Sequence, residues 1–297
     1  MGQCGGYGNF RSEMASIFAA KILKIPVRSL VIHHCCARPI FWTTFLNIIN
    51  NLLSKYLTSV ISVSKATRDS VFYKSNLLDR QSSLKDAVIY NGVSQINRND
   101  SFKNLNSIFK KKNKDILNIG MISRIESYKG QLDLIEGFAK LKLEDREKLN
   151  VFFIGQGDDA EVKNLKNILA LKKIEKHFIF TGYLDYESSS ISSHLDLLIS
   201  LTRTFEGFGL SIAEAMSTGT AVLATRVGAI PEYLNDSNSK LIDPGNSNQV
   251  LEALSDFLKN KKMWDERAVK ARNTINNKFT SEIMAKNYYN HFLQNFS

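Results

Sequence analysis

The stretch that decides the fold runs from Phe205 to Met216 and reads FEGFGLSIAEAM. Gly207 and Gly209 allow the backbone to come close to a ligand, and the first amides of the helix that follows suit an anion such as phosphate. Glu206 before this helix and Glu214 inside it are able to accept hydrogen bonds from sugar or ribose hydroxyls. The stretch therefore predicts a site for a hydroxyl-rich, anionic ligand; an ordinary amphipathic helix with a surface glutamate is the alternative.

Apolar runs alternate with amphipathic segments along the whole chain, which is typical of parallel β-sheets covered by helices. Strands are expected near residues 27–32, 59–63, 87–90, 116–122, 151–154, 178–181, 197–200, 221–224 and 240–242. Helices are expected near residues 11–23, 41–57, 65–72, 131–141, 161–171, 210–217, 249–259, 264–276 and 281–295. Residues 94–114, rich in Asn, Ser and Lys, are expected to form a linker.

Charge and length indicate the number of domains and the class of binding partner. The chain has 297 residues, with 39 Lys and Arg against 29 Asp and Glu, a net charge of +10. Two domains and an anionic partner follow as expectations. Nucleotide phosphates and an anionic membrane face are both compatible with this charge, whereas nucleic acid is not expected because the basic residues are spread along the chain. The run from Lys110 to Lys112 is expected to be solvated.

The cysteines favour neither a disulfide framework nor a metal site. Only Cys4, Cys35 and Cys36 are present, which predicts a reducing cytoplasm. His33 and His34 precede the cysteine pair, but four consecutive residues on an extended chain point to opposite faces and do not surround one ion. No metal is therefore expected.

Membrane segments are not expected either. The chain starts with a glycine-rich stretch and not with a secretory signal, and its most apolar segment, residues 40–57, is interrupted by Asn, Ser and Lys. This segment is expected to be an amphipathic helix that packs on a sheet. A helix lying on a membrane surface is the alternative.

Several motifs occur in a fixed order. They are Val63-Ser64-Lys65, Tyr90-Asn91-Gly92-Val93, Gly120 to Gly130 (GMISRIESYKG) and Phe153 to Gly157 (FIGQG), followed by Glu206 and Glu214. In this order, and with seven residues between the two glutamates, they resemble the family 4 retaining glycosyltransferases (glycosyl transferases group 1), from about Gly5 onward. The resemblance implies an α/β fold of the GT-B type, with two Rossmann-like parallel-sheet domains.

The resemblance also implies a division of the chain. We expect a partial acceptor-side domain over residues 1–105, a nucleotide-sugar-binding domain over 106–280, and a C-terminal helix over 281–297 that returns to the first domain. Only three strands are expected before the linker, whereas a Rossmann-like half usually has about six. The first domain is therefore expected to be incomplete. Three explanations stay open: the reading frame is truncated, the chain needs a partner, or its catalysis is impaired.

The same resemblance implies roles for individual residues. Arg124 and Lys129 would hold the diphosphate of a nucleotide sugar, Glu206 would contact the transferred sugar, and Glu214 would bind the ribose. The expected catalytic residues are Arg124, Lys129, Glu206, His33 and His34, and the expected donor-binding residues are Gly155, Gly157, Gly207, Phe208, Gly209, Leu210 and Glu214. Either histidine would lie near the transferred sugar; an ordinary core or surface histidine is the alternative. One departure from the family is Arg203, where a neutral residue is usual, in a segment one residue longer than is common.

The implied reaction is retaining transfer of a sugar from a nucleoside diphosphate to an acceptor hydroxyl, without a metal or other cofactor. A glycan or lipid-linked acceptor, peripheral membrane contact, a cytoplasmic location at the inner face of the plasma membrane, and bacterial surface polysaccharide or lipopolysaccharide synthesis are expected. Two alternatives stay open. One is an inactive remnant that only binds a nucleotide sugar, and the other is a sugar-nucleotide epimerase of the same fold.

Overall fold

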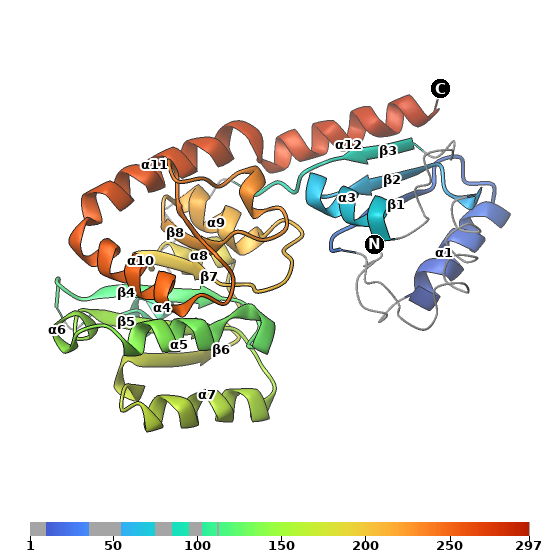
Figure 1. Cartoon of the computed structure of the whole chain (residues 1–297). Helices are drawn as coiled ribbons and strands as arrows, with labels where there is room; N and C mark the ends of the chain where they lie inside the picture. The colour runs from blue at the N-terminus through green and yellow to red at the C-terminus, as the bar shows by residue number, and fades with distance from the viewer. Residues whose placement is uncertain (1–9, 36–54, 75–84, 95–102, 112, 297) are drawn as a thin grey trace. The chain divides into compact units, whose positions relative to one another are not determined.

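A computed structural model describes residues 10–35, 55–74, 85–94, 103–111 and 113–296. The chain forms two compact units (Figure 1). Unit 1 takes Met1–Gly92, Phe205–Phe208 and Phe279–Ser297, and unit 2 takes Val93–Thr204 and Gly209–Lys278. The chain thus leaves unit 2 at residues 205–208 and returns to it directly afterwards.

Unit 1 is built on a parallel sheet of β1 (Ser29–Ile32), β2 (Ser59–Ser62) and β3 (Lys85–Val88), in the order β1-β2-β3. All four residues of the central strand β2 are buried, as expected for a parallel strand covered on both faces. Among its described residues, the helices of this unit are α1 (Phe10–Ile22), α3 (Lys65–Lys74) and α12 (Ser281–Phe296).

Helix α12 packs on this sheet although it ends the chain. His291 Nε2 lies 3.0 Å from Ser59 Oγ on β2, and Lys85 Nζ on β3 donates to Gln294 O at 2.8 Å. A Cβ at Gly92 would lie 2.3 Å from Thr280 O, just before α12 begins. A glycine is therefore required where the motif Tyr90 to Val93 meets the start of α12.

Unit 2 holds a six-stranded parallel sheet in the order β6-β5-β4-β7-β8-β9. Its strands are β4 (Leu117–Ile122), β5 (Leu149–Ile154), β6 (Phe178–Gly182), β7 (Leu197–Ser200), β8 (Ala221–Thr225) and β9 (Lys240–Ile242). Its helices are α4 (Lys103–Ile108), α5 (Gln131–Ala139), α6 (Leu143–Arg146), α7 (Asp159–Leu171), α8 (Ser188–Ser192), α9 (Leu210–Thr218), α10 (Ser247–Lys259) and α11 (Lys261–Lys278). Three short 3-10 helices, η2 (Ser127–Lys129), η3 (Glu175–His177) and η4 (Ile230–Glu232), complete it.

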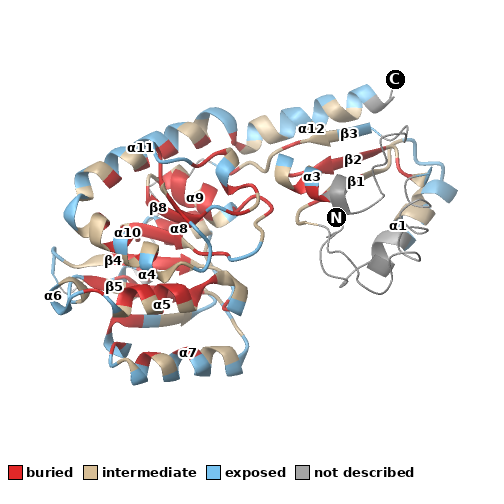
Figure 2. Ribbon diagram, viewed as in Figure 1, coloured by how far each residue is buried: buried red, intermediate tan, exposed pale blue. Residues whose placement is uncertain are grey.

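Consecutive residues of the central strands β4, β5, β7 and β8 are buried, as expected for parallel strands that are covered on both faces. Ile119, Val151 and Leu223 belong to one core cluster together with Phe138 of α5 and Leu254 of α10. Figure 2 shows most of the central strands as buried, whereas the edge strand β6 is mostly intermediate or exposed. The strand order reverses between β4 and β7, so their carboxyl ends diverge into loops on the two sides of the sheet, the position where open α/β sheets bind ligands.

Each predicted strand is confirmed, with its ends shifted by at most two residues. The predicted helix over residues 41–57 lies mostly outside the described residues, as do Cys4, Cys36 and the glycine-rich stretch near Gly5. Within the described part of the chain, none of the helices combines the length and apolar character needed to span a bilayer.

The predicted linker is wrong in part. Residues 103–108 form α4, and the side chains of Leu105 and Phe109 are buried. The Phe109 ring packs on Phe152 of β5, with ring centroids 4.7 Å apart. Lys111 is not simply solvated either, because its Nζ pairs with Asp196 Oδ2 at 2.6 Å. The segment after residue 102 is thus part of the packed structure of unit 2.

Candidate functional site

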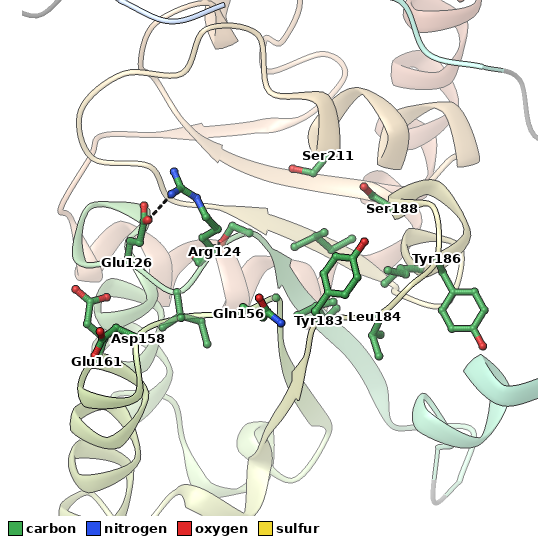
Figure 3. A pocket seen from close by; sticks show the side chains of 17 residues that line it. Arg124, Glu126, Gln156, Asp158, Glu161, Tyr183, Leu184, Tyr186, Ser188 and Ser211 are labelled. Carbon is green, nitrogen blue, oxygen red and sulfur yellow. Dashed lines mark hydrogen bonds and ion pairs between the residues drawn. The ribbon is translucent and has the colours of Figure 1, made fainter. Parts of the chain in front are cut away.

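Unit 2 contains a cavity of about 740 Å³ at the carboxyl ends of β4, β5 and β6 (Figure 3). Its wall is formed by the loops that follow these strands and by the first turns of α7, α8 and α9. The lining residues are Ile122 to Glu126, Ile154 to Asp158, Glu161, Tyr183, Leu184, Tyr186, Ser188, Ile191 and Ser211.

The first two loops continue the parallel pairing of their strands. Ser123 N donates to Ile154 O at 3.0 Å, and Ile125 N donates to Gln156 O at 2.8 Å. A Cβ at Gly155, where φ is +138°, would lie 2.2 Å from Ser123 O, and one at Gly157 would lie 2.5 Å from Ile125 Cβ. Both predicted glycines therefore line the cavity and also permit the close packing of its wall.

Arg124 extends from the loop after β4 and is 69% exposed. Its NH1 atom lies 2.6 Å from Glu126 Oε1, and its NH2 atom donates to the Tyr128 hydroxyl at 3.2 Å. Figure 3 shows this pair beside Asp158 and Glu161 at one end of the cavity. The guanidinium is therefore at the cavity but shares its charge with a neighbouring carboxylate.

Lys129 ends η2 and lies where β4 and β7 diverge. Its Nζ is 3.5 Å from Thr202 Oγ1 and 5.2 Å from the centroid of the Tyr128 ring. Gly130 follows with φ +82°, and a Cβ there would lie 2.2 Å from Leu201 O. The glycine thus lets η2 approach the end of β7 and brings the ammonium group of Lys129 to the loop that precedes α9.

Arg203, the residue that departs from the family pattern, has a buried partner. Its Nε donates to Asp133 Oδ2 at 2.8 Å and its NH2 atom to Asp133 Oδ1 at 2.6 Å. This two-pronged bond raises the pKa of the guanidinium above its already high value. The extra positive charge is therefore matched by a carboxylate of α5.

Helix α9 begins sharply at Gly209, whose φ of +83° is left-handed. A Cβ there would lie 3.0 Å from Ile230 Cδ1 and 3.1 Å from the Tyr233 hydroxyl. Leu210 is exposed, and Ser211 lines the cavity. The first amides of α9, which carry partial positive charge, therefore belong to the neighbourhood of the cavity.

Glu214 lies one turn further along α9 and is half-buried. Burial raises the pKa of its carboxyl, a hydrogen bond from Ser188 opposes this, and the charge of Glu187 adds to it. Its Oε2 atom is buried, and among the described residues it has no hydrogen-bond partner. Ser188 and Ser211 both line the cavity, so this carboxylate lies close behind the wall.

The other predicted residues lie in unit 1. His33 and His34 follow β1, and a Cβ at Gly207 would lie 1.9 Å from His33 O. The rings of His34 and Phe205 meet edge-on at 5.4 Å. Burial lowers the pKa of His33. The structure therefore brings both histidines to the segment that contains the half-buried Glu206.

Further contacts within unit 1 hold the segment Phe205–Phe208. Thr67 Oγ1, itself bonded by Ser64, donates to Gly207 O at 3.3 Å. Phe208 is 2% exposed and packs on Tyr90 and Phe279, with centroid distances of 6.3 and 5.8 Å. Its side chain therefore serves the core of unit 1.

The predicted residues thus form two groups. Unit 2 contains Arg124, Lys129, Gly155, Gly157, Gly209, Leu210 and Glu214, and unit 1 contains His33, His34, Glu206, Gly207 and Phe208. Sequence reasoning did not identify the lining residues Tyr183, Tyr186 and Ser188. Their position directly after the predicted strand 178–181 was the available signal, because ligands gather at the carboxyl ends of parallel strands.

Comparison with known sequences gives a consistent result. Residues 102–276, more than half of the chain, match the family described as Glycosyl transferases group 1. The N-acetyl-alpha-D-glucosaminyl L-malate synthase of Bacillus anthracis is 28% identical over 168 residues, 56% of this chain and 42% of that protein. The O-antigen biosynthesis glycosyltransferase WclY of Escherichia coli is 28% identical over 211 residues, 70% of this chain and 55% of that protein. The chain therefore spans about half the length of these curated relatives.

Solved structures show the same fold. Anabaena Alr3699/HepE, in complex with UDP and glucose, aligns with a TM-score of 0.79 at 20% identity, over 96% of this chain and 76% of that chain. A glycosyltransferase from Rickettsia africae ESF-5 aligns with a TM-score of 0.76 at 20% identity, over 99% of this chain and 84% of that chain. The predicted α/β fold of the GT-B type is thereby confirmed.

Proposed function

The chain belongs to the glycosyl transferases group 1 family, and we propose that it transfers a sugar from a nucleoside-diphosphate sugar to an acceptor hydroxyl. The donor nucleotide occupies the cavity of unit 2. Within the family, we propose that the chain is a retaining family 4 enzyme; the two glutamates with seven residues between them support this.

The observation that carries this proposal is the carboxylate of Glu214. A buried carboxylate oxygen without a hydrogen-bond donor is costly, by roughly 1–3 kcal/mol, unless a ligand supplies the donor. A ribose offers two neighbouring hydroxyl donors, and such a ligand relieves the cost on binding. The raised pKa of Glu214 has the same origin, because burial removes water from the charged form of the carboxyl.

The diphosphate requires positive charge beside the ribose. Lys129 supplies a point charge near the loop that precedes α9, and the amides at the start of α9 supply dipoles. Arg124 completes the set by exchanging Glu126 for a phosphate, a change that costs little because an exposed ion pair contributes about 0–1 kcal/mol. These groups balance the charge without a metal ion, so chelation with EDTA is expected to leave transfer unchanged.

The chemistry follows from the charge that develops. As the glycosidic carbon becomes cation-like, negative charge grows on the leaving diphosphate, and Arg124 and Lys129 stabilise it there. The departing phosphate accepts the proton of the acceptor hydroxyl on the same face of the sugar, so that the configuration is retained. Glu206 and one of His33 and His34 bind the transferred sugar, and neither glutamate acts as a covalent nucleophile.

The acceptor is proposed to be a glycan or a lipid-linked glycan of a surface polysaccharide. Support comes from the similarity to a glycosyltransferase named for O-antigen biosynthesis. Such an acceptor fits a cytoplasmic protein that contacts the inner face of the plasma membrane.

The test begins with binding. UDP, GDP and ADP are each titrated into the full chain while its melting temperature is recorded, because a ligand that binds only the native state raises it. One of the three is expected to give a clear rise, and Glu214→Ala is expected to abolish most of it. Lys163→Ala, at an exposed position of α7, serves as the control that changes charge outside the cavity.

Transfer is then measured with sugars of the nucleotide that binds. Release of the nucleoside diphosphate only in the presence of an acceptor supports a transferase, whereas interconversion of the nucleotide sugar would indicate the epimerase. Binding without release would indicate the inactive remnant. No response to any of the three nucleotides would contradict the proposed donor site.

A further inference from the structure

Three successive residues that leave β7 contact the loop that follows β4. Leu201 O packs against Gly130, Thr202 Oγ1 lies 3.5 Å from Lys129 Nζ, and Arg203 N donates to Tyr128 O at 2.7 Å. The two segments therefore lie side by side where the strand order of the sheet reverses.

The Arg203 side chain adds a second contact between these two segments. Its guanidinium forms both bonds to Asp133, whose side chain is 7% exposed and lies in the first turn of α5. Because Asp133 N also donates to Gly130 O at 3.0 Å, the carboxylate is fixed relative to the glycine that follows Lys129. A planar, two-pronged pair restricts orientation in a way that a single point contact does not.

Thr202 is held in turn by the sheet. It is 2% exposed, and its carbonyl oxygen accepts a hydrogen bond from Thr225 Oγ1 of β8 at 2.6 Å. The ammonium group of Lys129 therefore lies near the Thr202 hydroxyl. The position of Thr202 depends on its hydrogen bond with β8 and on Arg203, the next residue in the chain. Loss of the Arg203 side chain would keep the hydrogen bond between Thr202 and β8. It would remove the ion pair that ties residues 201–203 to Asp133 of α5.

We propose that Arg203 is a positioning residue, which acts through Asp133 and the 128–130 loop to fix the ammonium group of Lys129 for the donor diphosphate. This inference rests on the proposed function of the same site. A purely structural ion pair would stabilise the fold without any specific effect on Lys129.

The first experiment needs no ligand. The rate at which acetic anhydride acetylates Lys129 is measured by peptide mass spectrometry in the wild-type chain and in Arg203→Met, with Lys163 as the internal reference. Lys129 is expected to react several-fold faster in Arg203→Met, while Lys163 is unchanged. Lys172→Met, which removes the pair that α5 forms at Glu136, is the matched control and is expected to leave Lys129 unchanged.

The second experiment uses nucleotide binding. With the nucleoside diphosphate that the chain binds among UDP, GDP and ADP, Arg203→Met is expected to raise Kd roughly tenfold. In a Lys129→Ala background the same substitution is expected to change Kd less than twofold, because its effect passes through Lys129. Arg203→Lys keeps the charge but not the planar fork, and is expected to restore part of the affinity; it also serves if Arg203→Met does not fold.

The outcomes separate the two proposals. An unchanged acetylation rate at Lys129 in both Arg203 variants overturns the positioning role, as does a full effect of Arg203→Met on Kd when Lys129 is absent. If none of the nucleotides binds the wild-type chain, the donor site is contradicted, and the acetylation rate still decides whether Arg203 fixes Lys129.

Discussion

The two units assemble their candidate residues in different ways. In unit 2, Arg124, Gly155 and Glu214 follow the ends of their own strands or belong to a helix beside them. In unit 1, the segment 205–208 comes from a distant part of the sequence and packs against the backbone of His33 and the side chain of Thr67. Helix α12 also joins unit 1 from the end of the chain.

This difference predicts different sensitivities. A residue that follows a strand in unit 2 is placed by a core that its neighbours in sequence already form. The segment 205–208 is placed only by tertiary contacts, so a change there disturbs the packing of unit 1 first and any function second. Substitutions in unit 2 loops are therefore expected to change ligand binding with little change in stability.

The largest effect is expected from Gly207→Ala. The added Cβ would lie 1.9 Å from His33 O, and a backbone atom cannot move aside as a flexible side chain can. We expect unit 1 to lose about 3 kcal/mol of stability. Hydrogen exchange measures this directly, with faster exchange of the β2 amides and unchanged exchange of the β5 amides.

Gly245→Ala is the matched control for this substitution. Gly245 has φ +74°, but a Cβ there has nothing within 4 Å. Backbone strain alone therefore costs about 1 kcal/mol, confined to unit 2. Equal effects of the two substitutions on the β2 amides would show that the contact between Gly207 and His33 does not hold unit 1 together.

A smaller effect, on binding alone, is expected from Lys129→Ala. Removal of a charge-assisted hydrogen bond to the diphosphate is expected to weaken nucleotide binding by roughly ten- to hundredfold, on the scale of 1.5–3 kcal/mol for such bonds. The melting temperature is expected to stay within roughly one or two degrees of wild type, because most surface substitutions change stability by less than about 0.5 kcal/mol. Calorimetric titration of Lys129→Ala and Lys163→Ala tests this, and equal affinities would argue against a diphosphate at Lys129.

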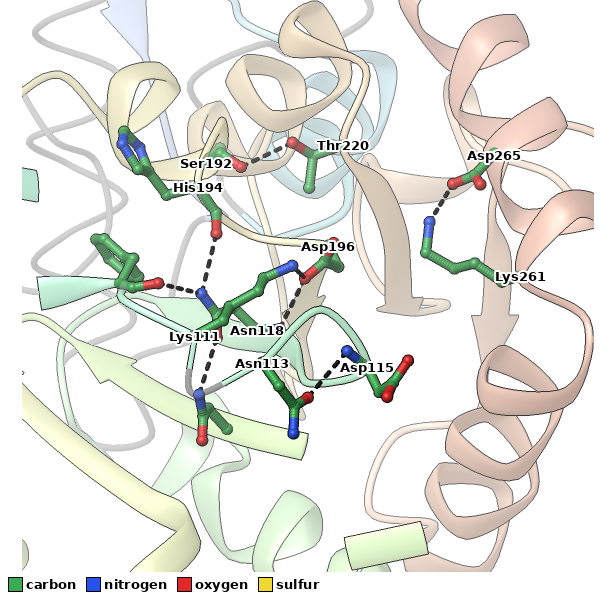
Figure 4. Close-up of polar contacts among 12 residues, drawn as sticks. Lys111, Asn113, Asp115, Asn118, Ser192, His194, Asp196, Thr220, Lys261 and Asp265 are labelled. Atoms are coloured by element: carbon green, nitrogen blue, oxygen red, sulfur yellow. Dashed lines mark hydrogen bonds and ion pairs between the residues drawn. The ribbon is translucent and has the colours of Figure 1, made fainter. Parts of the chain in front are cut away.

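The fold was predictable because its strands carry their signal locally. The strands Leu117–Ile122 (LNIGMI) and Leu197–Ser200 (LLIS) are mostly apolar, as expected for parallel strands buried on both faces. The segment around α4 was not predictable in this way. Its burial depends on partners far away in sequence, such as the bond from Asn118 Nδ2 to Phe109 O at 2.7 Å and the pair between Lys111 and Asp196 (Figure 4).

The candidate site was predictable only where a motif marked it. The glycines at 130, 155 and 157 are required by close packing, so their pattern carries physical information. The partner of Arg203 was not predictable, because Asp133 lies 70 residues away and reads as an ordinary helix residue. The unpartnered oxygen of Glu214 depends on burial by α8 and could not be inferred from the sequence of α9 alone.

Glu214→Gln is expected to have opposite effects on stability and binding. The amide removes a buried charge whose Oε2 atom has no hydrogen-bond partner among the described residues, so stability at neutral pH is expected to rise by about 1 kcal/mol. Nucleotide affinity is expected to fall, because a neutral amide oxygen accepts hydrogen bonds from ribose less strongly than a carboxylate. Denaturant titration and calorimetry measure the two effects, and a lower stability of the variant would indicate a structural role for Glu214.

The pH dependence sharpens this prediction. The pKa of Glu214 is raised in the folded chain, so the folded state binds more protons than the unfolded state in the window between the ordinary and the raised pKa. Wild-type stability relative to Glu214→Gln is therefore expected to fall as the pH rises through that window, and to be constant above it. Denaturation series of both proteins at several pH values would show this. A difference that does not depend on pH would contradict the raised pKa.

The smallest effect is expected from Glu126→Gln, which tests whether Arg124 is available to a ligand. The exposed pair at 2.6 Å contributes at most about 1 kcal/mol, so its loss is expected to leave stability unchanged within error. Because the guanidinium no longer has to exchange a carboxylate for phosphate, nucleotide affinity is expected to rise by roughly two- to fivefold, the equivalent of about 0.5–1 kcal/mol. Glu161→Gln, at the same end of the cavity but without the contact to Arg124, is the control. Weaker binding in Glu126→Gln would show that Glu126 holds Arg124 in its binding position, and would reverse the role assigned to this pair.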